Sequence, residues 1–264
     1  MASSSSKYTS KLSQKRVLVL GGTSGMGFCV AEAALEHGAT VIISGSNPTK
    51  LSKALDRLKT SYSDRKADVS GHTCDLSKPD ALESNIDILL KAATEGASLD
   101  HIAFTAGDAL KSTHVSEVTL EYVRNCGNVR FLAPLIVAKL APKYLTEGPG
   151  SSITLTGGVN TDRPTPGWSV IAAYGGAGEA MTRGLAVDLK PTRVNMVSPG
   201  SVHTELFDDI PKDKLEAVLD GMRDRTTVGE VGRPEDVAEA YIYAMKDRFV
   251  TGTLLRSNGG TLLT

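Results

Sequence analysis

The sequence predicts an α/β fold, a single domain with a doubly wound parallel sheet and helices on both of its faces. Two observations support this prediction. Short, continuous apolar runs alternate with longer segments in which apolar residues recur at helical spacing, a pattern typical of parallel strands buried on both faces. The length of 264 residues, of which 41% are hydrophobic and 22% charged, suits one domain with a large core.

The elements follow in a regular order. Residues 16–20 (RVLVL) form the first apolar run, a glycine-rich turn follows, and helical spacing then continues from Gly27 to His37 before Gly38. Further strands are expected at 40–44, 102–105, 152–156 and 193–198, and further helices at 48–58, 120–144 and 172–189. Two polar stretches, 61–71 and 160–167, are expected to be irregular, and neither resembles an interdomain linker.

Charge and hydropathy exclude several classes of partner. The 29 Lys and Arg residues balance 30 Asp and Glu residues, for a formal net charge of -1, so no basic excess favours nucleic acid or anionic lipid. No apolar run approaches the roughly 20 residues needed to span a bilayer, and the polar start of the chain lacks the apolar core of a signal peptide. We expect a cytoplasmic protein with a flexible N-terminal segment at 1–14 and the domain at 15–264.

The cysteines predict neither a metal site nor a disulfide framework. Cys29, Cys74 and Cys126 are odd in number and widely spaced, without a CxxC pair. We interpret them as reduced packing residues.

The glycine turn between the first strand and the first helix predicts a dinucleotide site. Glycines allow a tight turn, a close approach of pyrophosphate to the backbone and close packing of the helix on the strand, and the free N–H groups of the helix start then bind phosphate. An ordinary turn is the alternative interpretation, but the position after the first strand favours the cofactor. The expected contacts are Gly21, Thr23, Ser24, Gly25, Met26 and Gly27.

The end of the second strand indicates which dinucleotide binds. NAD sites place an Asp or Glu there to bind the ribose 2′-OH. Here Ser44, Ser46 and Asn47 are neutral, and Lys50 follows. A carboxylate would repel a 2′-phosphate, whereas these residues suit one, so we expect NADP(H); a simple polar turn is the alternative.

Several motifs in sequence order resemble those of short-chain dehydrogenases/reductases along nearly the whole chain. They are the glycine turn, Cys74-Asp75-Leu76, Thr105-Ala106-Gly107, Asn128, Ser198-Pro199-Gly200 with Thr204, and residues 232–236, 250–252 and 258–260. The resemblance implies a Rossmann-type domain with a seven-stranded parallel sheet. It also implies a homodimer or homotetramer that associates through the helices at 120–144 and 172–189.

The resemblance assigns further cofactor contacts. Asp75 and Leu76 are expected beside the adenine, and Thr105, Ala106 and Gly107 along the cofactor. Pro199, Gly200, Val202 and Thr204 are expected around the nicotinamide carboxamide.

The sequence departs from this family at the catalytic residues. The usual enzymes carry a Ser after the fifth strand, a Tyr thirteen residues later and a Lys four beyond that. Alignment on the fifth strand and the following helix puts Gly158, Ile171 and Gly175 at these positions, and only Asn128 of the usual set remains. Tyr174 lies close by, but its own +4 residue is Gly178; a packing role for Tyr174 and a catalytic one both remain open.

The loss of these residues favours a substrate that needs no proton donor. Hydride addition to a carbonyl forms an alkoxide and requires an acid, the task of the missing Tyr and Lys. Hydride addition to an iminium carbon gives a neutral amine. Glycines and apolar residues in place of the usual side chains would also leave room for a bulky small molecule.

These features resemble a fungal subgroup that acts on prenylated indole alkaloids. Its members reduce a cyclic iminium with NADPH and guide an intramolecular Diels–Alder closure to a bicyclo[2.2.2]diazaoctane, a reaction that needs mainly positioning. The resemblance makes Arg130 and Asp162 candidates for handling substrate, while Asp108 and Asn128 are expected near the nicotinamide. A surface salt bridge is the alternative role for Asp162, and capping of a turn is the alternative for Asp108.

Three functions stay open at this stage. The first is an NADPH-dependent reductase of an activated C=N bond, coupled to cycloaddition. The second is a conventional carbonyl reductase that uses Tyr174, and the third is a catalytically silent NADP(H)-binding protein. Trp168 could stack on an indole substrate, although a lone aromatic residue is more often part of the packing.

Overall fold

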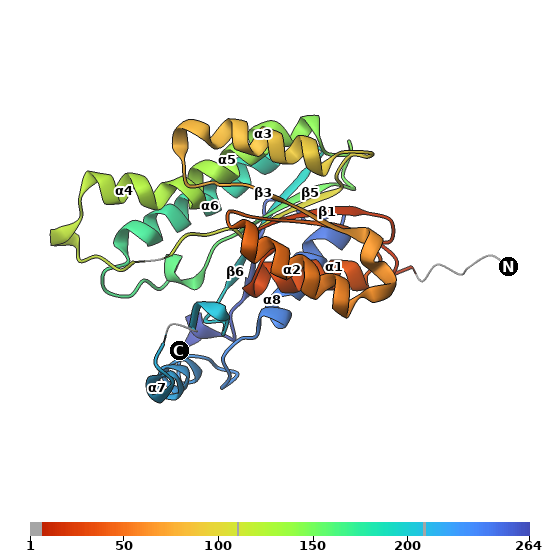
Figure 1. Ribbon diagram of the computed structural model, residues 1–264. Coiled ribbons are helices and arrows are strands. Elements are labelled where there is room, and N and C mark those ends of the chain that lie inside the picture. Colours follow the sequence, from red (N-terminus) through yellow and green to blue (C-terminus); the bar gives the residue numbers. More distant parts are fainter. Residues whose placement is uncertain (1–6, 110, 208–209) are drawn as a thin grey trace.

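One parallel sheet of seven strands, in the order β3-β2-β1-β4-β5-β6-β7, forms the centre of the computed structural model, which describes residues 7–109, 111–207 and 210–264 (Figure 1). The strands are β1 (Arg16–Leu20), β2 (Thr40–Gly45), β3 (Val69–Thr73), β4 (His101–Phe104), β5 (Ser152–Thr156), β6 (Arg193–Pro199) and β7 (Leu254–Ser257). The strand order reverses between β1 and β4, the point at which doubly wound sheets bind their ligands. The predicted fold class is confirmed.

The two edge strands are the ones that apolar patterning did not locate. β3 reads VSGHT and β7 reads LLRS, and both are largely half-exposed, whereas every residue of β4 and β6 is buried. An edge strand is shielded less than a central one, so it needs no continuous apolar run. The stretch 61–71, expected to be irregular, therefore contains the start of β3.

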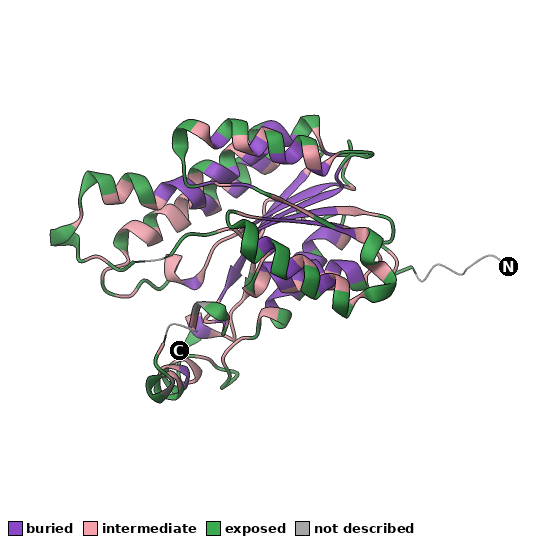
Figure 2. Ribbon diagram, in the orientation of Figure 1, coloured by how far each residue is buried: buried purple, intermediate pink, exposed green. Residues whose placement is uncertain are grey.

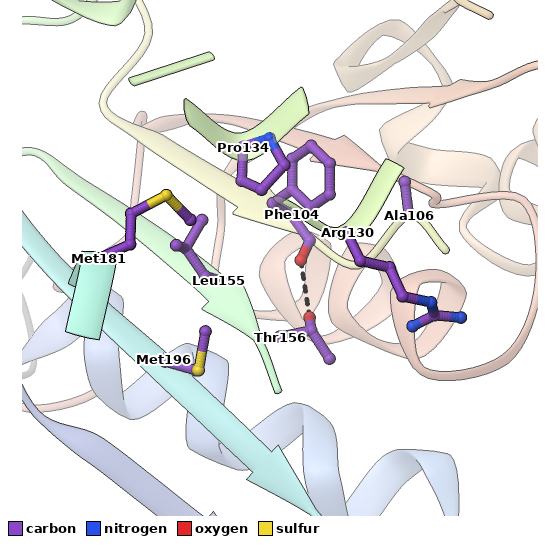
Figure 3. A pocket seen from close by; sticks show the side chains of 8 residues that line it. All are labelled: Phe104, Ala106, Arg130, Pro134, Leu155, Thr156, Met181 and Met196. Carbon is purple, nitrogen blue, oxygen red and sulfur yellow. Dashed lines mark hydrogen bonds between the residues drawn. The ribbon is translucent and has the colours of Figure 1, made fainter. Parts of the chain in front are cut away.

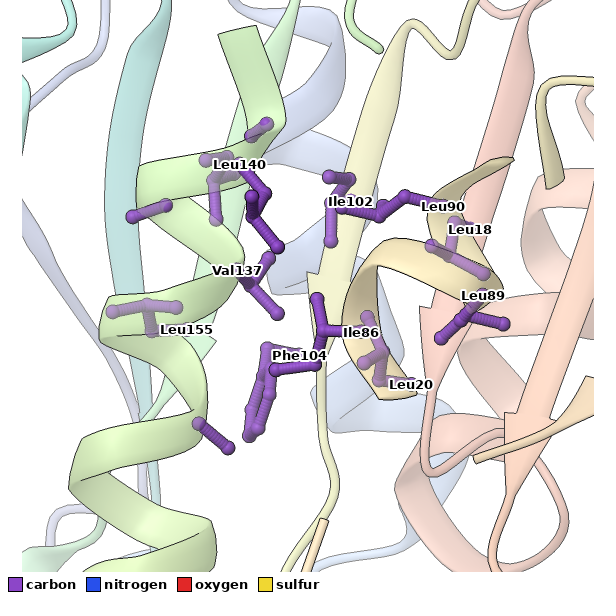
Figure 4. Close-up of a cluster of buried hydrophobic side chains, with 14 of the residues drawn as sticks. Leu18, Leu20, Ile86, Leu89, Leu90, Ile102, Phe104, Val137, Leu140 and Leu155 are labelled. Carbon is purple, nitrogen blue, oxygen red and sulfur yellow. The ribbon is translucent and has the colours of Figure 1, made fainter. Parts of the chain in front are cut away.

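Helices cover both faces of the sheet (Figure 1). α1 (Gly25–Glu36), α2 (Pro48–Ser61) and α8 (Pro234–Lys246) pack on one face, and α3 (Leu82–Ala93), α5 (Ala133–Leu140) and α6 (Ser169–Asp188) pack on the other. α4 (Leu120–Gly127) and α7 (Lys212–Arg223) extend from these layers. Buried residues concentrate in the strands and on the inward sides of the helices (Figure 2). Figure 4 shows one of the two cores, where Val137 and Leu140 of α5 face Ile102 and Phe104 of β4.

The expected continuous helix over 120–144 is interrupted. After α4 the chain forms a π-helical stretch, Asn128–Leu132, before α5, and it ends in a 3₁₀ turn at Ala141–Lys143. π-Helical turns are rare and occur often at functional sites. Here the stretch contains two of the predicted site residues, Asn128 and Arg130.

The packed part of the chain begins before residue 15. Residues 7–14, part of the segment expected to be flexible, form turns. Leu12 is only 1% exposed and belongs to the core on the face of α1. The other residues of that segment, 1–6, lie outside the described residues.

Two further features of the described residues concern membrane spans and metal ligands. None of the helices in the described ranges is sufficiently long and apolar for a bilayer span. Within the same residues, no group of three or more His, Cys, Asp or Glu side chains is arranged to hold a metal ion, and Cys29, Cys74 and Cys126 are free thiols.

Candidate cofactor and substrate site

The glycine turn brings the start of α1 close to the ends of β1 and β4. Gly21 has a φ of +85°, and a Cβ on it would lie 2.6 Å from the backbone nitrogen of Ala106. A Cβ on Gly27 would collide with Oγ1 of Thr105, and Gly25, with a φ of +53°, begins the helix. Larger residues would therefore separate α1 from the sheet. The helix start lies at the carboxyl edge of the sheet, with the geometry that a bound pyrophosphate requires.

The end of β2 fixes this turn through its backbone. The carbonyl oxygen of Ser44 accepts hydrogen bonds from the N–H groups of Gly21 at 2.8 Å and Gly22 at 3.1 Å. Ser44 itself is only 2% exposed, so its hydroxyl lies inside the fold. The side chain of Thr23 packs over Gly45, where a Cβ would lie 2.6 Å from Cγ2 of Thr23. The turn and the end of β2 thus form one packed unit.

The residues after β2 present a polar surface without a carboxylate. Ser46 is exposed, and the side chain of Asn47 caps α2 by accepting a 3.0 Å hydrogen bond from the N–H of Lys50. The positive end of the dipole of α2 and the cation of Lys50 in its first turn favour an anion. This donor set fits the 2′-phosphate of NADP(H).

The adenine side of the expected site is preorganised by local hydrogen bonds. Oδ1 of Asp75 accepts from the hydroxyl of Ser77 at 2.7 Å and from its N–H at 2.8 Å. These two bonds lower the pKa of Asp75 below its ordinary 3.8, the side-chain bond contributing most. Leu76 is buried in the core, and Oγ1 of Thr105 donates to the carbonyl of Leu20 at 2.8 Å. Asp75 is thus held as a carboxylate beside the strand ends.

The segment after β6 lies beside the glycine turn. A Cβ on Gly200, which follows Pro199 at the end of β6, would lie 2.9 Å from Cα of Asn258. Val202 forms a β-bridge with Gly232, and Cβ of Thr204 would lie 3.4 Å from a Cβ on Gly25. The structure therefore places the expected pyrophosphate and nicotinamide contacts at one edge of the sheet.

Arg130 and Asp108 form an ion pair next to this edge. Nε of Arg130 donates to Oδ1 of Asp108 at 3.0 Å, and Nη2 donates to the backbone oxygen of Asp108 at 2.5 Å. A Cβ on Gly107 would lie 2.7 Å from Nη2. Burial lowers the pKa of Arg130 from its ordinary value, and the charge of Asp108 opposes this shift. A guanidinium remains protonated in such surroundings, so the site contains a fixed cation with its counter-ion.

A small recess, with a volume of about 10 Å³, lies behind this pair (Figure 3). Its other lining residues are mostly apolar and are Phe104, Ala106, Pro134, Leu155, Thr156, Met181 and Met196. In Figure 3 the guanidinium of Arg130 points away from the apolar wall formed by Met181 and Leu155. The volume of the recess is room for about one water molecule, far below the range of about 300–1,000 Å³ typical of pockets for drug-sized ligands. The lining side chains would have to move before the recess could take a group of a larger molecule.

The two other predicted catalytic residues have different surroundings. Asn128 is 9% exposed at the start of the π-helical stretch. Asp162 pairs with Arg256 of β7, with Oδ2 3.3 Å from Nη2. The pKa of Glu179 is raised, first by burial and then by the charge of Asp162. Asp162 thus makes the salt bridge that was the alternative to a catalytic role.

The positions aligned with the family's Ser and Lys differ in the space around them. A Cβ on Gly158 would meet none of the described atoms within 4 Å, so this position is open. A Cβ on Gly175 would collide with Oγ1 of Thr161. Thr161 belongs to the loop after β5 and occupies the space that a side chain at position 175 would need.

Tyr174 is used in packing. Its hydroxyl donates a 3.0 Å hydrogen bond to the carbonyl of Val123 on α4. Its ring lies against Gly127, where a Cβ would be 2.6 Å from Cζ, and its centroid is 5.9 Å from that of Phe131. These contacts direct the phenol toward α4.

The sequence did not indicate the partners in three polar contacts around the site. Oε2 of Glu205 accepts a 2.7 Å hydrogen bond from the N–H of Gly25. Nη1 of Arg163 donates to the carbonyl of Thr261 at 2.8 Å, and Arg256 pairs with Asp162. Their partners are distant along the chain, so no local motif predicts them. The one signal that could have indicated such a contact was a charged residue directly after a cofactor motif. Only Glu205, which follows Thr204, has this signal.

Comparison with known proteins gives a family match over almost the whole chain. A family model described as an SDR-like Rossmann domain matches residues 8–264. The short-chain dehydrogenase/reductase malC of Malbranchea aurantiaca is 51% identical over 251 residues, which cover 94% of this chain and 95% of the relative. The short-chain dehydrogenase/reductase fsr5 of Gibberella fujikuroi is 43% identical over 259 residues, which cover 97% of this chain and 98% of the relative.

Solved structures agree with this match. The MalC reductase/Diels-Alderase from Malbranchea aurantiaca has a TM-score of 0.94 and 49% identity, over 97% of this chain and 100% of that one. A short chain dehydrogenase from Burkholderia cenocepacia J2315 in complex with NADP has a TM-score of 0.80 and 27% identity, over 96% of this chain and 99% of that one.

Proposed function

Because the chain belongs to the short-chain dehydrogenase/reductase family and is an NADP(H)-dependent short-chain reductase, we propose that it reduces an activated C=N bond, an iminium, in a bulky indole alkaloid. We further propose that the same pocket guides an intramolecular Diels–Alder closure to the bridged diazaoctane ring system. The similarity to the MalC reductase/Diels-Alderase supports this proposal.

The observation that carries the proposal is that the family's Tyr position holds Ile171, that the nearby Tyr174 is engaged in packing, and that the Lys position has no space for a side chain. Tyr174 donates its hydroxyl proton to Val123, and Thr161 fills the space that a lysine at position 175 would need. A ketone reductase must protonate the developing alkoxide. An iminium needs no such proton, because its C=N electron pair becomes the lone pair of the amine.

The residues of the site fit NADP(H), and different residues would bind its pyrophosphate and its 2′-phosphate. Gly21, Gly25 and Gly27 would hold the pyrophosphate, and Ser46 with Lys50 would face the 2′-phosphate. The bound cofactor supplies the hydride that ends on the iminium carbon. The protein's part is to hold that carbon at the nicotinamide edge and to keep water away from it.

Arg130 and Asp108 are suited to orient this substrate. The carboxylate of Asp108 balances a cationic iminium, and its side chain remains 39% exposed beside the pair. The guanidinium of Arg130 can donate to a carbonyl oxygen of the same molecule. The carboxylate of Asp108 and the guanidinium of Arg130 already hold each other in place without substrate, so these side chains lose little conformational freedom when substrate binds.

The apolar recess would receive the hydrocarbon part of the substrate only after it widens. Met181 and Met196 have flexible side chains, and their movement away from Leu155 would open space for a prenyl group, while the polycyclic core would lie outside, near the open position at Gly158. A cycloaddition within one molecule needs no acid or base. Holding diene and dienophile together is worth several kcal/mol, on the order of the effective-molarity effects of other pre-positioned reactions.

The proposed assembly is a homodimer or homotetramer in the cytoplasm. Large apolar side chains are exposed on the helices expected at the subunit interface, namely Leu120 (75%), Leu132 (37%), Leu135 (38%) and Val187 (67%). Exposed apolar patches favour association. Light scattering at micromolar concentration should give at least twice the monomer mass, and a monomer would contradict the proposed assembly.

A pair of matched substrates tests the function. The purified protein is given NADPH carrying deuterium at C4 and either a prenylated cyclic iminium or the ketone of the same ring skeleton. We expect deuterium at the former C=N carbon, and only the iminium should consume NADPH. Chromatography on a chiral phase should then show one enantiomer of the bridged product in excess over the reaction without protein. Turnover of the ketone alone would replace this proposal with the carbonyl-reductase alternative.

A further inference from the structure

A carboxylate lies where the pyrophosphate of a dinucleotide would bind. Oε2 of Glu205 accepts a 2.7 Å hydrogen bond from the N–H of Gly25, the first residue of α1. The first N–H groups of a helix have no helical partner, and the dipole favours an anion beside them. Glu205 therefore binds a backbone N–H group at the glycine turn, the kind of group that binds phosphate in dinucleotide sites.

Neighbouring contacts orient this carboxylate across the start of α1. Nη1 of Arg57 on α2 lies 3.9 Å from Oε1 of Glu205. The guanidinium of Arg57 in turn lies 4.1 Å from the ring centroid of Phe28 on α1, a cation–π distance. Arg57 and Glu205 have side chains that are 58% and 46% exposed. Ion pairs this exposed contribute little to stability, so the carboxylate can leave the turn at low cost.

The carboxylate and a bound pyrophosphate exclude each other. The N–H of Gly25 carries a single hydrogen, and two oxyanions at hydrogen-bond distance from it would repel each other strongly. We propose that Glu205 is a tethered competitor of the cofactor, so that NADP(H) must displace its carboxylate from Gly25 in order to bind. This is an autoinhibitory contact within the cofactor site.

Displacement of Glu205 links the pyrophosphate end of the cofactor site to the nicotinamide end. Glu205 follows Thr204, which packs against Gly25 and is expected at the nicotinamide end. When the pyrophosphate displaces Glu205, residues 201–207 lose one of their attachments to the turn. Arrival of the phosphates therefore repositions the segment that would contact the nicotinamide, and loss of the cofactor returns the carboxylate to Gly25.

Removing the charge tests the competition directly. Glu205→Gln keeps the size of the side chain and an acceptor oxygen but removes the negative charge. If the carboxylate occupies the turn in about nine molecules of ten, its removal should strengthen NADPH binding about tenfold, because apparent affinity scales with the fraction of competent protein. Titration of NADPH fluorescence measures this without turnover, and thermal unfolding checks that the variant is folded.

A second glutamate provides the matched control. The pKa of Cys29 on α1 is raised first by burial and then by nearby charges, among them those of Glu235, in the first turn of α8, and of Glu205. Glu235→Gln therefore removes an equal charge near α1 without touching the hydrogen bond to Gly25, and it should leave NADPH affinity unchanged within about twofold. An equal gain in both variants, or no gain in Glu205→Gln, would overturn the proposal.

Inorganic pyrophosphate locates the effect. It should compete with NADPH more strongly in Glu205→Gln than in the unchanged protein, because it resembles the part of the cofactor that would bind at the glycine turn and has no nicotinamide. A gain confined to NADPH would place the effect at the nicotinamide end and would likewise refute competition at Gly25. None of these measurements depends on the substrate, so they remain informative if the proposed reaction proves wrong.

Discussion

The guanidinium of Arg130 lies against Gly107, so closely that a Cβ on the glycine would be 2.7 Å from Nη2 and 3.0 Å from Nη1. The same guanidinium is fixed by the next residue, Asp108, through its carboxylate and its carbonyl oxygen. The position of the fixed cation thus depends on the lack of a side chain at 107. Gly107, expected from the sequence to line the cofactor, therefore also sets the position of Arg130.

Gly107→Ala should displace Arg130 and reduce turnover of the iminium. A shift of about 1 Å in a positioning group can cost on the order of 100-fold in rate, and we expect a loss of about 10- to 100-fold. Steady-state kinetics with a parallel NADPH titration separates this loss from weaker cofactor binding.

Two further variants control this experiment. Gly184 on α6 has no described atom within 4 Å of an added Cβ, so Gly184→Ala should retain full activity. In protein that already carries Arg130→Ala, Gly107→Ala should cost little more, because the displaced group is gone and the two changes are coupled. Full activity in Gly107→Ala would show that the position of Arg130 does not matter.

Arg130→Ala should reduce turnover by about one to two orders of magnitude with NADPH binding retained, whereas Tyr174→Phe should stay within a fewfold. Loss of a charge-assisted hydrogen bond is worth roughly 1.5–3 kcal/mol. The phenylalanine keeps the ring contact with Gly127 and loses only the bond to Val123. Comparison of kcat/KM for the two variants is the measurement. An inactive tyrosine variant beside an active arginine variant would favour the carbonyl-reductase mechanism.

NADPH should bind about tenfold or more tightly than NADH, a difference of about 1.4 kcal/mol. The polar end of β2 has no carboxylate to repel the 2′-phosphate, and Lys50 lies one turn into α2. Fluorescence titration with each cofactor tests the preference. Ser46→Asp should weaken NADPH binding far more than NADH binding. Equal affinities in the unchanged protein would contradict the cofactor assignment at this strand end.

Acid should destabilise the fold through His101. Burial lowers the pKa of this imidazole from its ordinary 6.5 to about 3, and the charges of Arg193 and Lys15 add to the shift, while Asp100 opposes it. Between these values the unfolded chain binds a proton that the folded chain does not. The free energy of unfolding should therefore fall by up to about 1.4 kcal/mol per pH unit as the pH decreases below 6.5.

Urea unfolding at about pH 7, 6 and 5 measures this slope. His101→Gln should reduce it, because glutamine does not titrate and can still hydrogen-bond to Oγ of Ser152, the present partner of the imidazole. His203→Gln, at an exposed position, should leave the slope as it is. An unchanged slope in His101→Gln would assign the acid sensitivity to other groups.

The sequence predicted the parts of the structure that depend on local patterns. The continuous burial of β1, β4, β5 and β6 requires apolar runs, and these were visible. The turn at Gly21 requires a residue that tolerates a positive φ, and the glycine in the sequence predicted this turn. The edge strand β3 was harder to locate because Gly71 and His72 interrupt its apolar pattern. A partly exposed edge strand tolerates such an interruption.

Contacts between distant segments could not be predicted in the same way. The π-helical stretch that begins at Asn128 breaks a sequence with good helical spacing on both sides. Asp162 was a candidate for chemistry because it lies in the appropriate loop, but its ion pair depends on Arg256, which enters from β7. Such pairings follow from how loops meet in space, and spacing along the chain does not encode them.

The contact between Thr161 and Gly175 also bears on how this chain could evolve. A lysine introduced at 175 would collide with the loop after β5, whereas a serine at 158 would have open space. A conventional proton relay uses its Ser, Tyr and Lys together, and the lysine cannot fit at position 175 until the loop after β5 has moved. If the chain reduces an iminium as proposed, single substitutions toward carbonyl reduction would meet this packing contact first, and residue 175 could gain a side chain only after, or together with, a change in the loop that holds Thr161.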